Sequence, residues 1–107
     1  MSYLDMEQVK IVKNELDGLE IALQGDIDLS NAEAFYQEVA TAYSAVPADI
    51  VFDCQALNFI DSTTLGTFVK ILKKAKENGH KMRLFGLQPK IKKLFVICSL
   101  DSIMEIA

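Results

Sequence analysis

Helix-sized amphipathic segments alternate with short apolar runs along this chain, and that alternation is the strongest constraint on its fold. Apolar side chains recur every three or four residues over 32–46 and again over 65–75, a period typical of a helix with one buried face. The run Ile-Val-Phe at 50–52 lies between them and is typical of a central strand buried on both faces. Strands that alternate with helices in this way predict an α/β domain.

A hairpin is expected before the first helix. Residues 19–24 alternate apolar and polar side chains, and 9–13 form a matching strand, with Asp17-Gly18 as the turn between them. Ser30 stands three residues before Glu33, a capping-box spacing that predicts the start of a helix. Pro47 ends that helix or closely follows its end.

The second half of the chain continues the alternation. Asn78-Gly79 ends the second helix, and residues 82–85 have the pattern of another strand. Pro89 is placed for the first turn of a short helix that runs through Phe95, and residues 103–106 predict a last edge strand. The predicted order is β-β-α-β-α-β-α-β in a mixed sheet, with the hairpin as its antiparallel part.

Composition limits the class of protein. The chain has 107 residues, half of them apolar, which suits one domain and leaves no room for a second. No apolar run approaches the roughly 18–20 residues that span a bilayer, so no membrane insertion is expected. Residues 1–7 lack the basic and apolar parts of a signal peptide. Cys54 and Cys98 form no metal or redox motif and are expected to be small buried hydrophobic residues, which favours a cytoplasmic setting.

Charge is unevenly distributed along the chain. Residues 1–69 contain two basic and twelve acidic side chains, whereas 70–107 contain nine basic and three acidic ones, for a net charge of −4. The acidic total disfavours direct DNA binding. Folding can interleave the two halves, so the asymmetry by itself identifies no partner.

The residue types needed for catalysis are scarce. His80 is the one histidine of the sequence and follows the Gly79 helix stop, where we expect a solvated turn and not a general base. Ser62 lacks the flanking glycines of a nucleophile elbow, and the chain has neither a P-loop nor a dinucleotide fingerprint. We therefore expect no catalytic residue, no cofactor and no enzymatic activity.

Two charged groupings have alternative interpretations. Asp26 and Asp28 at the end of a strand could supply oxygen ligands to a divalent cation, but such a pair is more often a solvated rim or a helix-entry cap, and no metal is expected. The lysines of the second helix are interpreted as a solvated face. Those of the late helix have an acidic partner or a phosphate as the alternative. The lysines in question are Lys70, Lys73, Lys74, Lys76, Lys90, Lys92 and Lys93.

Asp61-Ser62-Thr63-Thr64 places three hydroxyls where a loop enters a helix. A plain N-cap accounts for one such side chain, not three. A helix N-terminus also tolerates negative charge, so a phosphoserine there would add roughly two charges to the surface without unfolding the domain. The segment is a candidate phosphorylation switch.

Three stretches, in order and in register, resemble one family. Asn-Phe-Ile-Asp-Ser-Thr-Thr-Leu-Gly at 58–66 resembles the Asp-Ser-x-Gly-Leu-Gly signature of STAS domains, and is most similar to bacterial anti-sigma factor antagonists. Leu-Gln-Gly-Asp-Ile-Asp at 23–28 is similar to the family's acidic element before its first helix. Leu-Gln-Pro at 87–89, with Lys-Leu-Phe at 93–95 and Leu100, resembles its late helix. The resemblance implies a single STAS-type α/β domain at 1–107, a mixed β-sheet with an N-terminal hairpin and helices packed on one face.

The resemblance also implies a function. Family members are cytoplasmic regulators whose unphosphorylated form binds an anti-sigma factor that is also a serine kinase, which frees the sigma factor. Phosphorylation of the signature serine ends the complex, and a phosphoserine phosphatase resets it. Carried over by position, Ser62 is the phosphoacceptor, and the expected partner-binding residues are Asp26, Asp28, Ser30, Asn31, Asp61, Thr63 and Thr64.

The sequence departs from the family pattern at two places. Thr64 stands where the family usually has glycine, which makes the turn bulkier, and Thr63 or Thr64 could accept phosphate in place of Ser62. The chain stops at Ala107, whereas many relatives continue into a further helix, and an exposed last strand would favour a homodimer. The alternative function is a non-switching STAS scaffold, either stressosome-like or an accessory subunit of a transporter.

Overall fold

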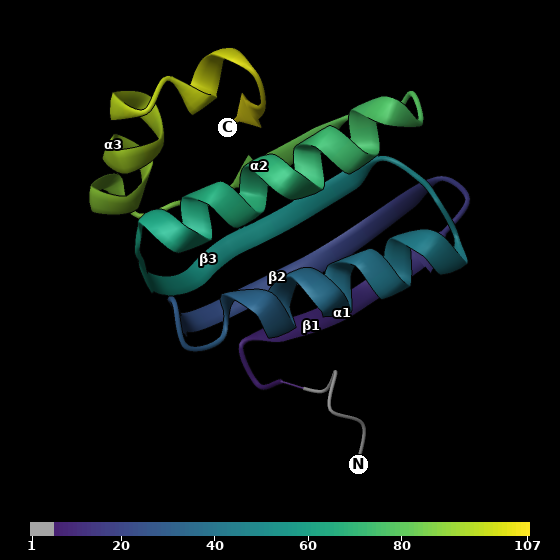
Figure 1. The fold of residues 1–107 in the computed structure, drawn as a ribbon, viewed down its shortest axis with the longest axis horizontal. Coiled ribbons are helices and arrows are strands. Elements are labelled where there is room, and N and C mark those ends of the chain that lie inside the picture. Colours follow the sequence, from purple (N-terminus) through teal and green to yellow (C-terminus); the bar gives the residue numbers. More distant parts are fainter. Residues whose placement is uncertain (1–5) are drawn as a thin grey trace.

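The short apolar runs form one mixed sheet whose strands stand in chain order, as the computed structural model of residues 6–107 shows (Figure 1). The strands are β1 (Val9–Glu15), β2 (Gly18–Ile27), β3 (Ile50–Ile60), β4 (Met82–Phe85) and β5 (Glu105–Ile106). β1 pairs antiparallel with β2, and each later neighbour pairs parallel. The predicted hairpin, mixed sheet and last edge strand are confirmed, with Leu16 and Asp17 forming the hairpin turn.

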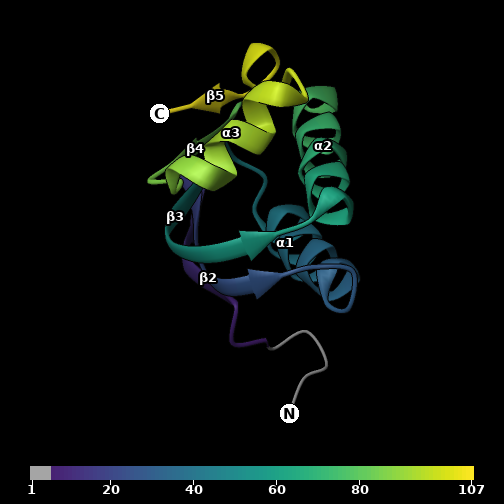
Figure 2. The same cartoon turned by 90° about the vertical axis from the view of Figure 1, so that its left-hand side faces the viewer.

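Three helices cover one face of the sheet. They are α1 (Ala32–Ala45), α2 (Ser62–Glu77) and α3 (Pro89–Ile97), and a 3-10 turn (Leu100–Ser102) follows. Figure 2 shows α1 and α2 together on one side of the strands. Most apolar positions that predicted the helices are buried, and Pro89 opens α3 as expected. The fold class is therefore the predicted one.

Four phenylalanines join the helices to the sheet. Phe68 of α2 lies edge-on to Phe35, Phe52 and Phe95, with ring centroids 5.3–5.5 Å apart. All four rings are completely buried. Such T-shaped pairs add to the stabilisation that burial itself provides. The cluster fixes the start of α2 against β3 because Phe68 lies in the second turn of that helix.

β3 is longer than the apolar run that predicted it. Its register with β2 shifts twice, between the pairs Ala22–Asp53 and Gln24–Ala56 and again after the pair Gly25–Leu57. Each shift places one extra residue in β3, which is a β-bulge. Beyond the second bulge Phe59 is 46 % exposed.

Three local predictions are wrong. The capping box does not form, because α1 begins after Asn31 and Ser30 hydrogen-bonds to Asp28. Cys98 is exposed at the end of α3, whereas Cys54 is buried as expected. His80 is half-buried, and its Nδ1 lies 2.5 Å from the hydroxyl of the buried Tyr43.

No helix within residues 6–107 is long and apolar enough to cross a membrane. The prediction that the N-terminus is not a signal peptide rests largely on residues 1–5, which lie outside the described part of the chain.

Candidate functional site

The carboxyl ends of β2 and β3 lie side by side, and each strand leads at once into a helix. Ile27 and Ile60 are the last paired residues of the two strands. Because the strands are parallel, the loops that follow them meet at one edge of the sheet. This edge, near the start of α2 in Figure 1, holds every residue that the sequence assigned to the site.

Asp61 joins the two loops. One carboxylate oxygen accepts the Thr64 N–H at 3.0 Å and so caps α2, and the other accepts the Leu29 N–H at 2.9 Å. These hydrogen bonds, with the Thr64 N–H as the largest contributor, lower the pKa of Asp61. The carboxylate thus serves mainly to hold the site together, in addition to any contact with a partner.

Ser62 is the first residue of α2, and its side chain is exposed. Thr63 is exposed as well. A serine hydroxyl at this position is open to solvent beside the positive end of the helix dipole. Such a hydroxyl can accept a phosphoryl group without disturbing the buried core.

Thr64 faces the interior. It is completely buried, and its hydroxyl donates to the Ile27 carbonyl at 2.5 Å and lies 3.1 Å from a carboxylate oxygen of Asp61. The buried side chain offers no surface to a partner or a kinase, which disfavours the predicted partner contact and the alternative phosphorylation at Thr64, and both stay predictions. A glycine at this position would have no hydroxyl to link α2 to the end of β2.

The loop between β2 and α1 is held by its own side chains. Asp28 accepts hydrogen bonds from the N–H and the hydroxyl of Ser30, at 2.9 and 2.6 Å. Asn31 accepts the Asp28 N–H at 2.8 Å and donates to the Asp26 carbonyl at 3.1 Å. Asp26 also accepts from Asn58 of β3 at 3.2 Å. Of the predicted contact residues here, Asp26 and Ser30 are exposed, whereas Asp28 and Asn31 are half-buried.

Two exposed apolar side chains at this edge were not predicted as site residues from the sequence. Leu29 is 75 % exposed at the tip of the β2–α1 loop, and Phe59 lies at the end of β3. The exposure of Leu29 could have been predicted, since it is an apolar residue inside an otherwise polar loop. Phe59 was missed because only the apolar run at 50–52 predicted the strand, whereas β3 continues to Ile60 and Phe59 lies on the face opposite the buried Ile60.

The edge has the chemistry of a binding surface. Residues 24–31 and 58–64 contain three aspartates and no lysine, arginine or histidine. His80 lies beyond the far end of α2 and so provides no base for Ser62. Within residues 6–107, histidine, cysteine and acidic side chains form no group of three that could hold a metal ion.

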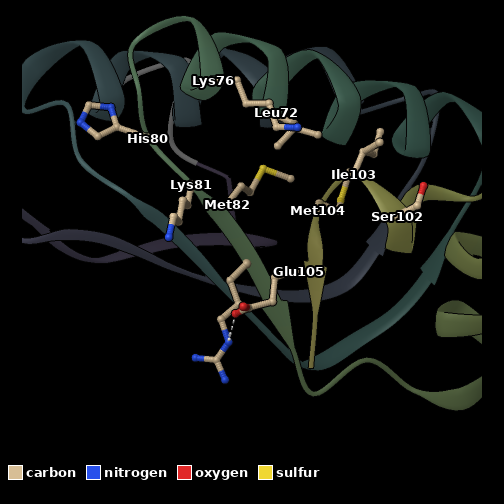
Figure 3. A pocket seen from close by; sticks show the side chains of 10 residues that line it. Leu72, Lys76, His80, Lys81, Met82, Ser102, Ile103, Met104 and Glu105 are labelled. Carbon is tan, nitrogen blue, oxygen red and sulfur yellow. Dashed lines mark ion pairs between the residues drawn. The ribbon is translucent and has the colours of Figure 1, made fainter.

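A separate hollow lies toward the far end of α2 (Figure 3). Its volume is about 270 Å³, and Leu72, Met82 and Met104 contribute apolar lining. Arg83 and Glu105 form an ion pair of 3.0 Å beside it. None of the predicted site residues lines this hollow, so the edge that carries Ser62 remains the candidate site.

Comparison with known proteins identifies the family of this chain. The family model described as STAS domain matches residues 4–107. The anti-sigma-B factor antagonists of Listeria monocytogenes and Bacillus subtilis are each 29 % identical to this chain over 92 % of its length, and 86 % and 89 % of those proteins are covered. The fold matches that of the Bacillus cell fate determinant SpoIIAA in its phosphorylated form, with a TM-score of 0.70 and 23 % identity, over 94 % of this chain and 89 % of that one. The chain belongs to the STAS domain family, in which it is similar to anti-sigma factor antagonists over nearly its whole length.

Proposed function

We propose that this chain is a cytoplasmic anti-sigma factor antagonist switched by phosphorylation of Ser62. The unmodified form binds an anti-sigma factor that is also a serine kinase, and the sigma factor is released. The observation that carries the proposal is the exposed Ser62 hydroxyl at the start of α2, on an acidic edge held in place by Asp61. The names of the relatives, which antagonise anti-sigma-B factor, support the same function.

The switch requires a group transfer by the partner. The kinase moves the γ-phosphoryl group of ATP to the Ser62 oxygen, so that ADP leaves and the hydroxyl proton passes to a base of the kinase. The product carries about two more negative charges beside the aspartates of this edge. A phosphate at a helix N-terminus leaves the fold intact, so binding is lost through local bulk and repulsion. A phosphatase then restores the serine.

The inward direction of Thr64 supports the switch over the non-switching scaffold. The sequence raised the scaffold because a threonine in place of glycine would crowd the loop. The buried side chain instead leaves Ser62 and Thr63 open at the surface. A kinase therefore has the access to Ser62 that the proposal needs.

Incubation with ATP and the anti-sigma factor kinase of the same organism tests the proposal. We expect one added phosphoryl group by intact mass, located on Ser62 by fragmentation, and none on the Ser62→Ala variant. Phosphorylation of Thr63→Val should proceed as in the wild type. An unmodified chain in the presence of a kinase that binds it, together with large assemblies by light scattering, would favour the scaffold.

A further inference from the structure

We propose that Leu29 is the apolar anchor through which this chain docks on its anti-sigma factor, an inference that rests on the function proposed above. An exposed leucine is ordinary on a protein surface. This one is 75 % exposed, and its backbone is hydrogen-bonded directly to the residue that precedes the phosphoacceptor. Its position, and not its exposure alone, carries the argument.

The loop presents Leu29 in a fixed conformation. The residues on either side are held by hydrogen bonds of 2.6–2.9 Å between Asp28, Ser30 and Asn31. The Leu29 N–H is held by Asp61. Ordering a mobile segment reduces binding free energy, so an apolar side chain on a preordered loop is well suited to anchor a complex. Interface energy is typically concentrated in a few such residues.

The anchor and the switch share one footprint. Asp61 accepts the Leu29 N–H with one carboxylate oxygen and caps the helix that begins at Ser62 with the other. A partner that covers Leu29 therefore also covers Ser62. Phosphate on Ser62 would separate the partner from this anchor, which explains how one modification ends the complex.

Phe59 extends the apolar surface on the β3 side. It lines a groove of about 150 Å³ between the end of β3 and α3, together with Ile91, Leu94 and the charged Lys90. Leu94 is 36 % exposed. Ser62 thus has an apolar side chain on the β2–α1 loop and an apolar groove on the α3 side.

The negative charge around Leu29 indicates what kind of partner surface is complementary to this site. Asp61 accepts the N–H of the anchor, Asp28 precedes it and Asp26 lies at the end of β2, just before the same loop. Segments 24–31 and 58–64 contain no basic residue, whereas Lys90 of α3 lies on the Phe59 groove beyond them. A complementary partner has an apolar pocket for Leu29 with lysine or arginine side chains around it. We assign this pocket to the anti-sigma factor and not to a second copy of the chain, because two acidic edges would repel each other.

Titration of the purified anti-sigma factor of the same organism against three forms of the chain tests the proposal. Leu29→Ala should raise Kd by at least about tenfold. Leu16→Ala is the matched control, because Leu16 is 87 % exposed in the turn at the opposite end of β2, and it should bind as the wild type does. Both variants should keep the wild-type unfolding midpoint, since neither side chain is packed in the core.

Each outcome decides between the proposals. Wild-type affinity in Leu29→Ala would overturn the anchor and leave the proposed function standing. Equal losses in both leucine variants would indicate non-specific apolar contact and also overturn it. Self-association of the wild type that Leu29→Ala abolishes, with unchanged affinity for the anti-sigma factor, would assign the anchor to a second copy. Absence of binding by the wild type would overturn the proposed function and the anchor with it.

Discussion

Replacement of Thr64 by valine tests the structural link between α2 and the end of β2. Valine has nearly the same shape but no hydroxyl, so the Ile27 carbonyl loses its donor while the packing is retained. Both residues are completely buried, so water does not replace the hydrogen bond. Removing one partner of a buried hydrogen bond costs about 1–3 kcal/mol. For a chain of 107 residues that corresponds to a fall in Tm of about 4–13 °C.

Urea unfolding and differential scanning calorimetry measure this loss. Thr63→Val is the matched control, because the neighbouring threonine is exposed and its replacement should change stability by no more than about 0.5 kcal/mol. Thr64→Val with wild-type stability, or an equal loss in Thr63→Val, would refute the conclusion that Thr64 faces inward. An accessible Thr64 would also revive its role as an alternative phosphoacceptor.

Three further predictions concern other parts of the fold. Gly86→Ala should lower the free energy of unfolding by more than about 1 kcal/mol, because the φ of Gly86 is +78° and an added Cβ would approach a β3 side chain to 2.5 Å. Gly66→Ala in α2, where an added Cβ meets open space, should raise it by about 0.5–1 kcal/mol in the same urea experiment. Iodoacetamide should label Cys98 in the folded protein and reach Cys54 only after unfolding, because burial raises the pKa of the Cys54 thiol to about 12. Equal labelling rates of the two cysteines in the folded protein would contradict the burial of Cys54. The difference in unfolding free energy between wild type and Asp61→Asn should be largest near pH 7 and should shrink as the pH falls below about 4. The reason is that a carboxylate whose pKa is lowered in the folded state stabilises the fold while it is ionised and loses that effect on protonation. A difference that grows in acid would contradict the pKa shift.

Elements whose cause is local were predictable from sequence. The helical period over 65–75, the turn residues of the hairpin and Pro89 each act within a few residues, and the structure has the corresponding elements. The placement of the candidate site residues at one edge of the sheet was also predictable, because parallel strands bring their following loops to one edge. Features decided by tertiary contacts were not predictable in this way.

The N-terminus of α1 shows why. Ser30, Asn31 and Asp28 all have side chains suited to a cap, and the spacing to Glu33 favoured Ser30. In the folded chain Ser30 bonds to Asp28, and Asn31 bonds to backbone on its N-terminal side. The competition among similar side chains was settled by loop geometry, which the spacing does not encode.

The direction of Thr64 and the exposure of Phe59 have a similar origin. Thr64 turns inward because the Ile27 carbonyl, 37 residues earlier, lies within reach of its hydroxyl. Phe59 turns outward because pairing with β2 extends β3 as far as Ile60, and Phe59 lies on the face opposite the buried Phe52 and Ile60. Both bear on the site, since the first leaves Ser62 accessible and the second adds apolar surface beside it.

The affinity of the anti-sigma factor for the two states of Ser62 tests the central claim most directly. Calorimetric titration would compare the unmodified chain with the same chain carrying one phosphoryl group on Ser62. We predict tight binding of the unmodified chain and a Kd at least about a hundredfold higher after phosphorylation. Equal affinity of the two forms, or binding that requires the phosphate, would contradict the account.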